Sequence, residues 1–443
     1  MAELNIGRLK LDLFCAGARI DESCTLEAET RPVKRTRGGL GSGLDVILPR
    51  KIWVNIPIAE PFAYKSPYIL VKEDGKYQLC RENELGKKEV ICKISLPPRP
   101  DWYEQKTASG KCMGDIGVMQ GTYFAVYPSD LCGFWKDAPR RNCRFCSVGL
   151  CHGKTESEEK TVADVVESVK AAIKHEHITF VHFNTGFYED DRALDVIRPY
   201  VRAIKCETNL LVGVQCPPAI DLSKYDQLKK AGADHVSFCY EIFSPDHFRE
   251  ICPGKSAYFG KCARELKSDK LLQEVRQKAK TFEVEPDDGQ LIFYRALAYC
   301  LTLWRKGQVS GEIVAGLEPT ESSIKAVEFN ASFGAVTTVC VFRPCEGTDL
   351  EQQNPPEPKS LSPVLARMYE VCMEYSIPYG IAPNIRTAMV HLPQEGRYLS
   401  LKNYGLFRKS MGKFRQGAMK VVFRTNWAMK KQINFFKSIK EVR

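Results

Sequence analysis

The chain has 443 residues, of which 44% are hydrophobic and 27% are charged, and these proportions exclude a disordered chain. No run of about 18 apolar residues occurs, so no transmembrane segment is predicted, and without a signal peptide we expect a cytoplasmic protein. The net charge of +10 is concentrated in residues 397–443, which carry thirteen Lys or Arg residues and one acidic residue.

Residues 1–118 are predicted to form a smaller, strand-rich domain. Residues 51–58 alternate in polarity, residues 66–80 hold Asp74-Gly75 between two apolar runs, and residues 89–96 form another strand pattern. Residues 31–48 are expected to be a flexible loop. Its GGLGSGL sequence has the outline of a phosphate loop, but it lacks the Lys-Ser/Thr pair and a preceding strand, so we assign it no ligand.

From residue 119 to residue 385, strand patterns alternate with helix patterns. Strands are expected at residues 122–127, 178–183, 210–214, 236–242, 312–315, 336–342 and 378–381, and helices at 162–173, 192–204, 224–230, 291–304, 322–331 and 360–373. Such a series predicts a parallel sheet that right-handed crossovers curl into a full or partial (β/α) TIM-type barrel. A doubly wound open sheet is the alternative. The charged residues 262–288 are expected to form a helical insertion.

Residues 386–443 form a basic tail in which aromatic residues alternate with Lys and Arg. The interpretation we favour is a helix that packs on the barrel through Val422, Met429, Ile433 and Phe436. The same composition suits a nucleic acid partner or a membrane surface, and both stay open.

Four cysteines gather in one short segment that follows the first predicted strand of the barrel. They are Cys132, Cys143, Cys146 and Cys151, whereas the 18 cysteines of the whole chain are too sparse for a disulfide scaffold. Four thiolates could hold a structural zinc ion, and a single CxxC could be a redox motif. Three thiolates on one loop could instead hold an iron–sulfur cluster.

At this loop the chain resembles the radical SAM superfamily, whose cysteines usually follow a CxxxCxφC pattern. The segment Cys143-Arg144-Phe145-Cys146 reproduces the CxφC half, and the resemblance implies that Phe145 lies beside the adenine of S-adenosylmethionine (SAM). Cys132 takes the place of the first cysteine, although the spacing to Cys143 is expanded. The implied ligands of a [4Fe–4S] cluster are therefore Cys132, Cys143 and Cys146, with Cys151 as the alternative to Cys132.

Three later segments fall where that superfamily contacts SAM. Asn184-Thr185-Gly186 follows the second strand in the place of the family's GGE segment, although Thr185 replaces a glycine and Phe187 the glutamate. The resemblance implies that Glu241, at the end of the fourth strand, binds the ribose; an ion pair with Lys or Arg is the structural alternative. Residues 311–318 resemble the GxIxGxxE segment, which implies adenine contacts from Ile313 and Gly316.

The resemblance implies an enzyme that uses a [4Fe–4S] cluster and SAM to abstract hydrogen from a small-molecule substrate. It also implies a flavodoxin- or ferredoxin-like electron donor. Radical modification or methylation of RNA or protein is the alternative that the basic tail favours, and a non-catalytic zinc protein is the second alternative. The sequence assigns no residue to a directly catalytic role.

Overall fold

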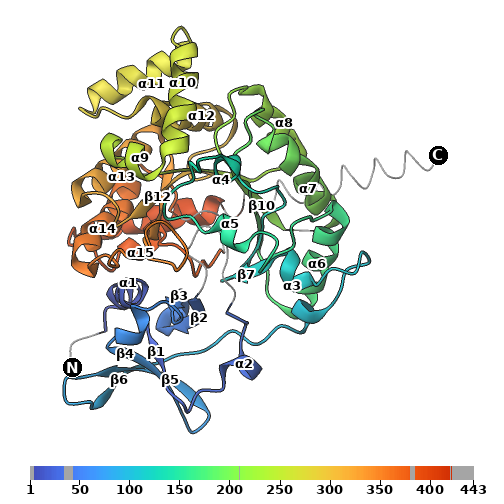
Figure 1. Cartoon of the computed structure of the whole chain (residues 1–443). Coiled ribbons are helices and arrows are strands. Elements are labelled where there is room, and N and C mark those ends of the chain that lie inside the picture. Colours follow the sequence, from blue (N-terminus) through green and yellow to red (C-terminus); the bar gives the residue numbers. More distant parts are fainter. Residues whose placement is uncertain (1–3, 34–42, 209, 380–384, 420, 422–443) are drawn as a thin grey trace.

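The centre of the computed structural model is a curled seven-stranded sheet (Figure 1). The structure describes residues 4–33, 43–208, 210–379, 385–419 and 421. The strands lie side by side in chain order: β7 (Val118–Gln120), β8 (Tyr123–Val126), β9 (Phe180–Asn184), β10 (Leu211–Gln215), β11 (His235–Glu241), β12 (Val309–Ala315) and β13 (Val336–Val341). Strands β8 to β13 are parallel, and β7 pairs antiparallel with β8 at the edge.

Helices follow the parallel strands and cover the outer face of the sheet (Figure 1). They include α6 (Val162–His175), α7 (Ala193–Glu207), α8 (Ser223–Ala231), α12 (Asp288–Leu303), α13 (Thr320–Phe333) and α14 (Pro358–Glu374). A capping box at Thr161 begins α6, and Gly232 ends α8 with a φ of 111°. Because the strand order never reverses, the sheet is a partial (β/α) barrel and not a doubly wound sheet.

The predicted helical insertion exists, and it begins earlier in the chain than expected. It consists of α9 (Pro245–Ile251), α10 (Pro253–Glu265) and α11 (Lys270–Thr281), and α10 and α11 both pack against α12. Figure 1 shows α10 and α11 at one end of the barrel. Among the described residues, none of the helices combines the length and the apolar character needed to cross a membrane.

The N-terminal part contains the expected strands and also a helix that the sequence reading missed. The strands are β1 (Arg19–Ile20), β2 (Gly43–Leu48), β3 (Ile52–Pro57), β4 (Tyr68–Glu73), β5 (Lys76–Glu82) and β6 (Lys88–Lys93). Helix α1 (Ile6–Ala16) begins at Asn5, whose side chain accepts a hydrogen bond from the Arg8 N–H. The loop expected at residues 31–48 is wrong over β2, which pairs along its whole length with β3; residues 34–42 lie outside the described part.

Residues 385–391, which we call the closing segment, cross the open side of the half-barrel. At one end the Thr122 N–H donates to the carbonyl of Arg386 (2.8 Å), and at the other His391 pairs with Val339 of β13. Between them the Asn55 N–H on β3 donates to the carbonyl of Ala388 (2.8 Å). The strand expected at 378–381 does not form over residues 378 and 379, and residues 380 and 381 lie outside the described part. The partner of β13 on this side is His391 of the closing segment.

The described part of the basic tail begins with buried contacts and continues as a surface helix. Tyr404 is buried, whereas Leu406, Phe407 and Phe414 of the helical residues 406–419 are exposed. Residues Val422, Met429, Ile433 and Phe436, through which the tail was expected to dock, lie outside the described part of the chain. The docking of this region therefore stays a prediction.

Candidate functional site

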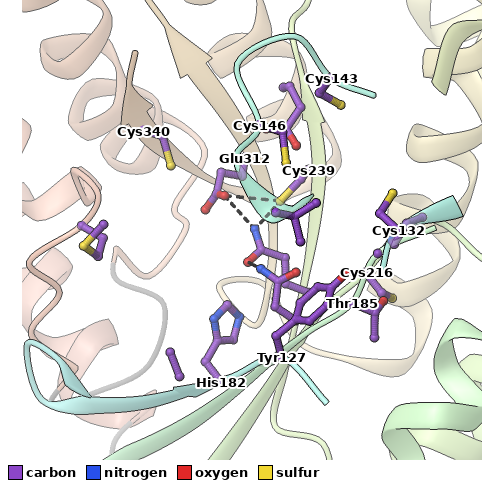
Figure 2. A pocket seen from close by; sticks show the side chains of 18 of the residues that line it. Tyr127, Cys132, Cys143, Cys146, His182, Thr185, Cys216, Cys239, Glu312 and Cys340 are labelled. Atoms are coloured by element: carbon purple, nitrogen blue, oxygen red, sulfur yellow. Dashed lines mark hydrogen bonds between the residues drawn. The ribbon is translucent and has the colours of Figure 1, made fainter. Parts of the chain in front are cut away.

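A cavity of about 220 Å³ lies inside the half-barrel and extends along the inner face of its parallel strands to their carboxyl ends. Side chains that alternate along the strands point into it, for example Tyr123 and Ala125 from β8 and Glu312 and Val314 from β12. The cysteine loop forms one wall, and Ile385, Thr387, Met389 and Val390 of the closing segment form another. Figure 2 shows Glu312, His182 and the labelled cysteines of the loop around this cavity.

Three of the four loop cysteines line the cavity, and the fourth does not. Cys132 stands just beyond β8 at the start of α4 (Gly133–Lys136), and Cys143 and Cys146 follow on the same loop. Cys151, in α5 (Val148–Cys151), is fully buried, and its sulfur lies 3.8 Å from the Ser147 hydroxyl. The thiols that face the cavity are thus the three that the family resemblance selected.

The Asn184-Thr185-Gly186 segment lies directly against Cys132. A Cβ atom added to Gly186 would stand 2.6 Å from the Cys132 Cα and 2.5 Å from the Tyr127 hydroxyl, so only glycine fits. The next residue, Phe187, donates its backbone N–H to the Cys132 sulfur at 3.4 Å. The Thr185 hydroxyl is buried beside the cavity and has no hydrogen-bond partner. Asn184 also lines the cavity, where its amide donates to Gln215 (2.9 Å).

Lys255 is a buried cation that lines the cavity together with the cysteine loop. A hydrogen bond from the Cys252 side chain, and then the charge of Lys255, lower the pKa of the Cys143 thiol although burial opposes them. Burial alone would lower the pKa of Lys255, but the negative charges of Cys143 and Glu241 raise it well above its usual value. For Cys132 and Cys146 burial dominates, and it raises the pKa of both thiols.

Glu241 lies where the sequence predicted, at the end of β11, and its carboxylate faces the cavity. A β-bulge between Cys239 and Glu241 shifts the register with β12, and Glu241 adopts a φ of 73°, which is strained for a side chain other than glycine. Its carboxylate pairs with the Lys255 ammonium at 2.8 Å. The structural alternative for Glu241, an ion pair at a strand end, is therefore present, and both partners line the cavity.

Two residues expected to contact SAM do not line this cavity. Ile313 is fully buried in the main hydrophobic core, because its neighbours Glu312 and Val314 take the inward positions of β12. Gly316 adopts a φ of 102°, and a Cβ atom added there would meet Pro356 at 2.7 Å. Phe145, in contrast, does line the cavity and is 6% exposed.

Sequence reasoning missed the residues at the centre of the cavity, Glu312 and Gln215. Glu312 lies within the GxIxGxxE-like segment, in which the family resemblance assigns contacts only to Ile313 and Gly316. The signal that could have found Glu312 is its polarity in an otherwise apolar strand. Gln215, at the end of β10, donates to Glu312 at 2.7 Å.

The thiols are spread around the cavity wall. Among the described residues, no three His, Cys, Asp or Glu side chains lie close enough together to ligate one metal ion. A four-iron cluster is held at its corners, so its thiolates stand further apart than the ligands of a single ion. A loop that presents three thiols to one cavity, with a glycine backbone pressed against Cys132, fits such a cluster.

No protein-family model matches the chain. A segment of 158 residues is 25% identical to bacteriochlorophyllide c C-7(1)-hydroxylase of Chlorobaculum limnaeum, and it covers 36% of this chain and 32% of that protein. The chain thus matches about a third of the length of this curated relative.

Three solved structures show limited similarity to the half-barrel. HydG, a maturase of the [FeFe]-hydrogenase, aligns with a TM-score of 0.40 and 15% identity over 56% of this chain and 49% of its own. Methylornithine synthase (PylB) aligns with a TM-score of 0.38 and 17% identity over 56% of this chain and 63% of its own. Coproporphyrinogen III oxidase (HemN) from Escherichia coli, described as a radical SAM enzyme, aligns with a TM-score of 0.34 and 11% identity. The alignment covers 60% of this chain and 56% of that one.

The fold and the site define a (β/α) half-barrel that presents a loop of three thiols to its central cavity. This arrangement agrees with the resemblance of the cysteine motif to the radical SAM superfamily.

Proposed function

We propose that Cys132, Cys143 and Cys146 hold a [4Fe–4S] cluster and that the chain uses it to cleave SAM reductively. The observation that carries the proposal is that these three thiols, and not Cys151, line the same cavity. When both groups are bound, the reduced cluster supplies the electron that splits SAM into methionine and a 5′-deoxyadenosyl radical, which removes a hydrogen atom from the substrate. The electron donor is proposed to be a flavodoxin- or ferredoxin-like protein.

The residues of the chain have separate tasks in this proposal. The Phe187 N–H and the Lys255 ammonium stabilise negative charge on Cys132 and Cys143. The free Thr185 hydroxyl is available to the polar end of SAM, and Phe145 to its adenine. Glu241 accepts the ribose hydroxyls from its place beside Lys255. The apolar side chains of the cavity exclude water, which protects a reactive carbon radical.

We infer that the substrate is a small molecule. The cavity lies inside the half-barrel and the closing segment covers one side of it, which leaves little room for a polymer. The curated relative, named as a hydroxylase of a bacteriochlorophyllide, agrees with this class. Modification of RNA or protein is the second candidate, and the exposed Phe407 and Phe414 of the basic tail support it.

The reaction is tested by anaerobic reconstitution of the full chain with iron and sulfide, followed by dithionite and SAM. We expect 5′-deoxyadenosine, detected by mass spectrometry, and an electron paramagnetic resonance signal from the reduced cluster. If the purified protein held zinc and formed no 5′-deoxyadenosine, the proposed function would be wrong.

The ligand set is tested by counting iron in two variants that differ only in which loop cysteine is removed. We expect Cys132→Ala to lose most of its cluster iron and Cys151→Ala to keep it, because Cys151 points away from the cavity. Full iron occupancy in Cys132→Ala would overturn the ligand choice. Cys151→Ala is the matched control, since it also removes a thiol from this loop.

A further inference from the structure

Glu312 is the central polar group of the cavity, and only neutral groups hold it. Its Oε1 accepts from the Gln215 amide (2.7 Å) and the Cys239 thiol (3.3 Å), and its Oε2 accepts from the Thr338 hydroxyl (3.0 Å). The Asn184 amide in turn donates to Gln215 at 2.9 Å. This network crosses β9 to β13 and fixes the direction of the Glu312 carboxyl group.

Glu312 has no cationic partner in the described part of the chain, in contrast to Glu241. Lys255 pairs with Glu241, whereas Glu312 is affected by burial, by the charge of Glu241 and by neutral hydrogen-bonding side chains, among them Cys340. Burial first, and then Glu241, raise the pKa of Glu312. Burial without a cation disfavours the ionised carboxylate of Glu312, and a cation bound in the cavity would stabilise that form.

Apolar side chains dominate one part of the cavity, and the His182 ring lies against them, 6.0 Å from the Tyr123 ring. Tyr123, Ala125, Phe180 and Ile385 form a small hydrophobic cluster there, and the cavity lining continues along the closing segment. Glu312 lines the same cavity as this apolar cluster and the cysteine loop. A ligand that fills this space meets mainly hydrocarbon and aromatic surface, the polar side chains of Gln120, His182 and Thr387, and the carboxyl group of Glu312.

We propose that this part of the cavity binds a substrate with an apolar body and a protonated amine, and that the amine pairs with Glu312. The assignment of this ligand as the substrate rests on the proposed function, because the cluster and SAM would occupy the side of the cysteine loop. The ammonium group supplies the positive charge that Glu312 lacks, and the apolar cluster covers the rest of the molecule. A charge-assisted hydrogen bond in a water-poor site makes the site bind a protonated amine more tightly than a neutral polar group.

The test compares benzylamine with benzyl alcohol, which has the same ring and a neutral polar group. Binding to the anaerobically reconstituted full chain is measured by calorimetry without reductant or SAM. We expect the amine to bind at least about tenfold more tightly than the alcohol, and we expect Glu312→Gln to remove that difference. Glu328→Gln, at a half-exposed glutamate on α13 that does not line the cavity, is the matched control and should keep it.

The proposal is overturned if wild-type protein binds the two probes equally or if Glu312→Gln keeps the preference. It is also overturned if Glu312→Gln weakens SAM binding tenfold while amine binding stays unchanged, since Glu312 would then serve SAM. Glu312→Met, which fills a similar volume, repeats the comparison should the glutamine variant unfold. The binding comparison does not require SAM cleavage. If the chain forms no 5′-deoxyadenosine but still prefers the amine, the proposed function is wrong and the amine site stands.

Discussion

Gly186 is the residue at which the backbone of the barrel approaches the cysteine loop most closely. An alanine there places its Cβ 2.6 Å from the Cys132 Cα, which is a backbone atom and not the flexible end of a side chain. We expect Gly186→Ala to lower the free energy of unfolding by about 1–3 kcal/mol, the usual effect of overpacking, and to reduce the iron bound after reconstitution. Chemical denaturation and iron analysis measure the two effects.

Gly417 provides the control for this substitution. It is also part of the described chain, and a Cβ atom added there meets nothing within 4 Å. Gly417→Ala should leave iron content unchanged and should not destabilise the protein, because alanine is a better helix former. Equal iron loss in both variants would contradict the proposed close approach at Cys132.

His235, at the start of β11, makes the stability of the protein depend on pH. The ring is fully buried with no hydrogen-bond partner for either nitrogen, and burial, followed by His182, lowers its pKa to about 3. Below pH 6.5, the ordinary pKa of histidine, the unfolded chain takes up a proton that the folded chain excludes. The stability present above that pH is therefore lost as the pH falls toward 3.

We expect His235→Leu to remove this dependence. Between pH 6 and 4, the unfolding free energy of the wild type should fall relative to that of the variant by up to about 1.4 kcal/mol per pH unit. Urea denaturation at several pH values measures the difference. His175→Leu, at an exposed position near the end of α6, should follow the wild type. Parallel curves for the wild type and His235→Leu would contradict the expectation.

At the scale of single residues, the sequence could predict which cysteines line the cavity, but it could not predict for every strand residue whether its side chain points into the cavity. Cys143 and Cys146 lie close in sequence, so their shared position follows from local spacing. The sequence does not show that Ile313 lies outside the cavity lining, because β12 is buried on both sides and an apolar pattern there does not show which side points inward. Glu312 and Lys255 acquire their environments from distant strands and helices, which local patterns do not contain.

At the scale of elements, the closing segment depends on a buried ion pair with α1. The Lys10 ammonium donates to both oxygens of Glu395 (2.8 and 2.9 Å) and to the carbonyl of Val390 (3.2 Å). His391 also contacts Glu395, at 3.3 Å. Lys10 is completely buried, so this pair ties the cavity wall to the first helix of the chain.

We expect Lys10→Met to destabilise the protein by about 3–5 kcal/mol, because it leaves the Glu395 carboxylate buried without its cation. Hydrogen exchange should also become faster in residues 385–391. Adding Glu395→Met to this variant should recover part of the stability, since the unpaired charge is then gone. Lys87→Met, at an exposed lysine, should change neither quantity. Normal exchange in the closing segment of Lys10→Met would contradict this role.

Most helices and parallel strands could be predicted because their patterns are local, whereas α1 and the closing segment could not. In α1 the apolar residues alternate over Leu9–Leu13 as in a strand, and only packing buries Lys10 among them. The pairing of His391 with Val339, and of Lys10 with Glu395, joins segments that are far apart in the sequence.

At the scale of the whole molecule, the N-terminal part and the barrel share one hydrophobic core. A single cluster of buried residues extends from Ile6 to Tyr404. Arg343, at the end of β13, is 3% exposed and donates to the carbonyl and the side chain of Asn55 on β3 (3.0 and 3.2 Å). The domain boundary at residue 118 stays a prediction, because these contacts cross it.

We therefore expect residues 119–443, produced without residues 1–118, not to fold cooperatively. Removal of α1, β2 and β3 exposes apolar core and leaves Arg343 and Glu395 without their partners. Circular dichroism during heating should show no sharp transition, whereas the full chain should show one. A cooperative transition near that of the full chain would instead establish the barrel as an independent domain.

The position of the closing segment in the chain also sets an order of assembly during synthesis. The cysteine loop leaves the ribosome long before Val390, and at roughly 5–20 residues per second the interval is tens of seconds. Until Val390 and Glu395 emerge, Lys10 has no partner and one wall of the cavity is absent. The nascent chain therefore offers its thiols from the open side, and the same wall closes over the cavity only once the far end of the chain arrives.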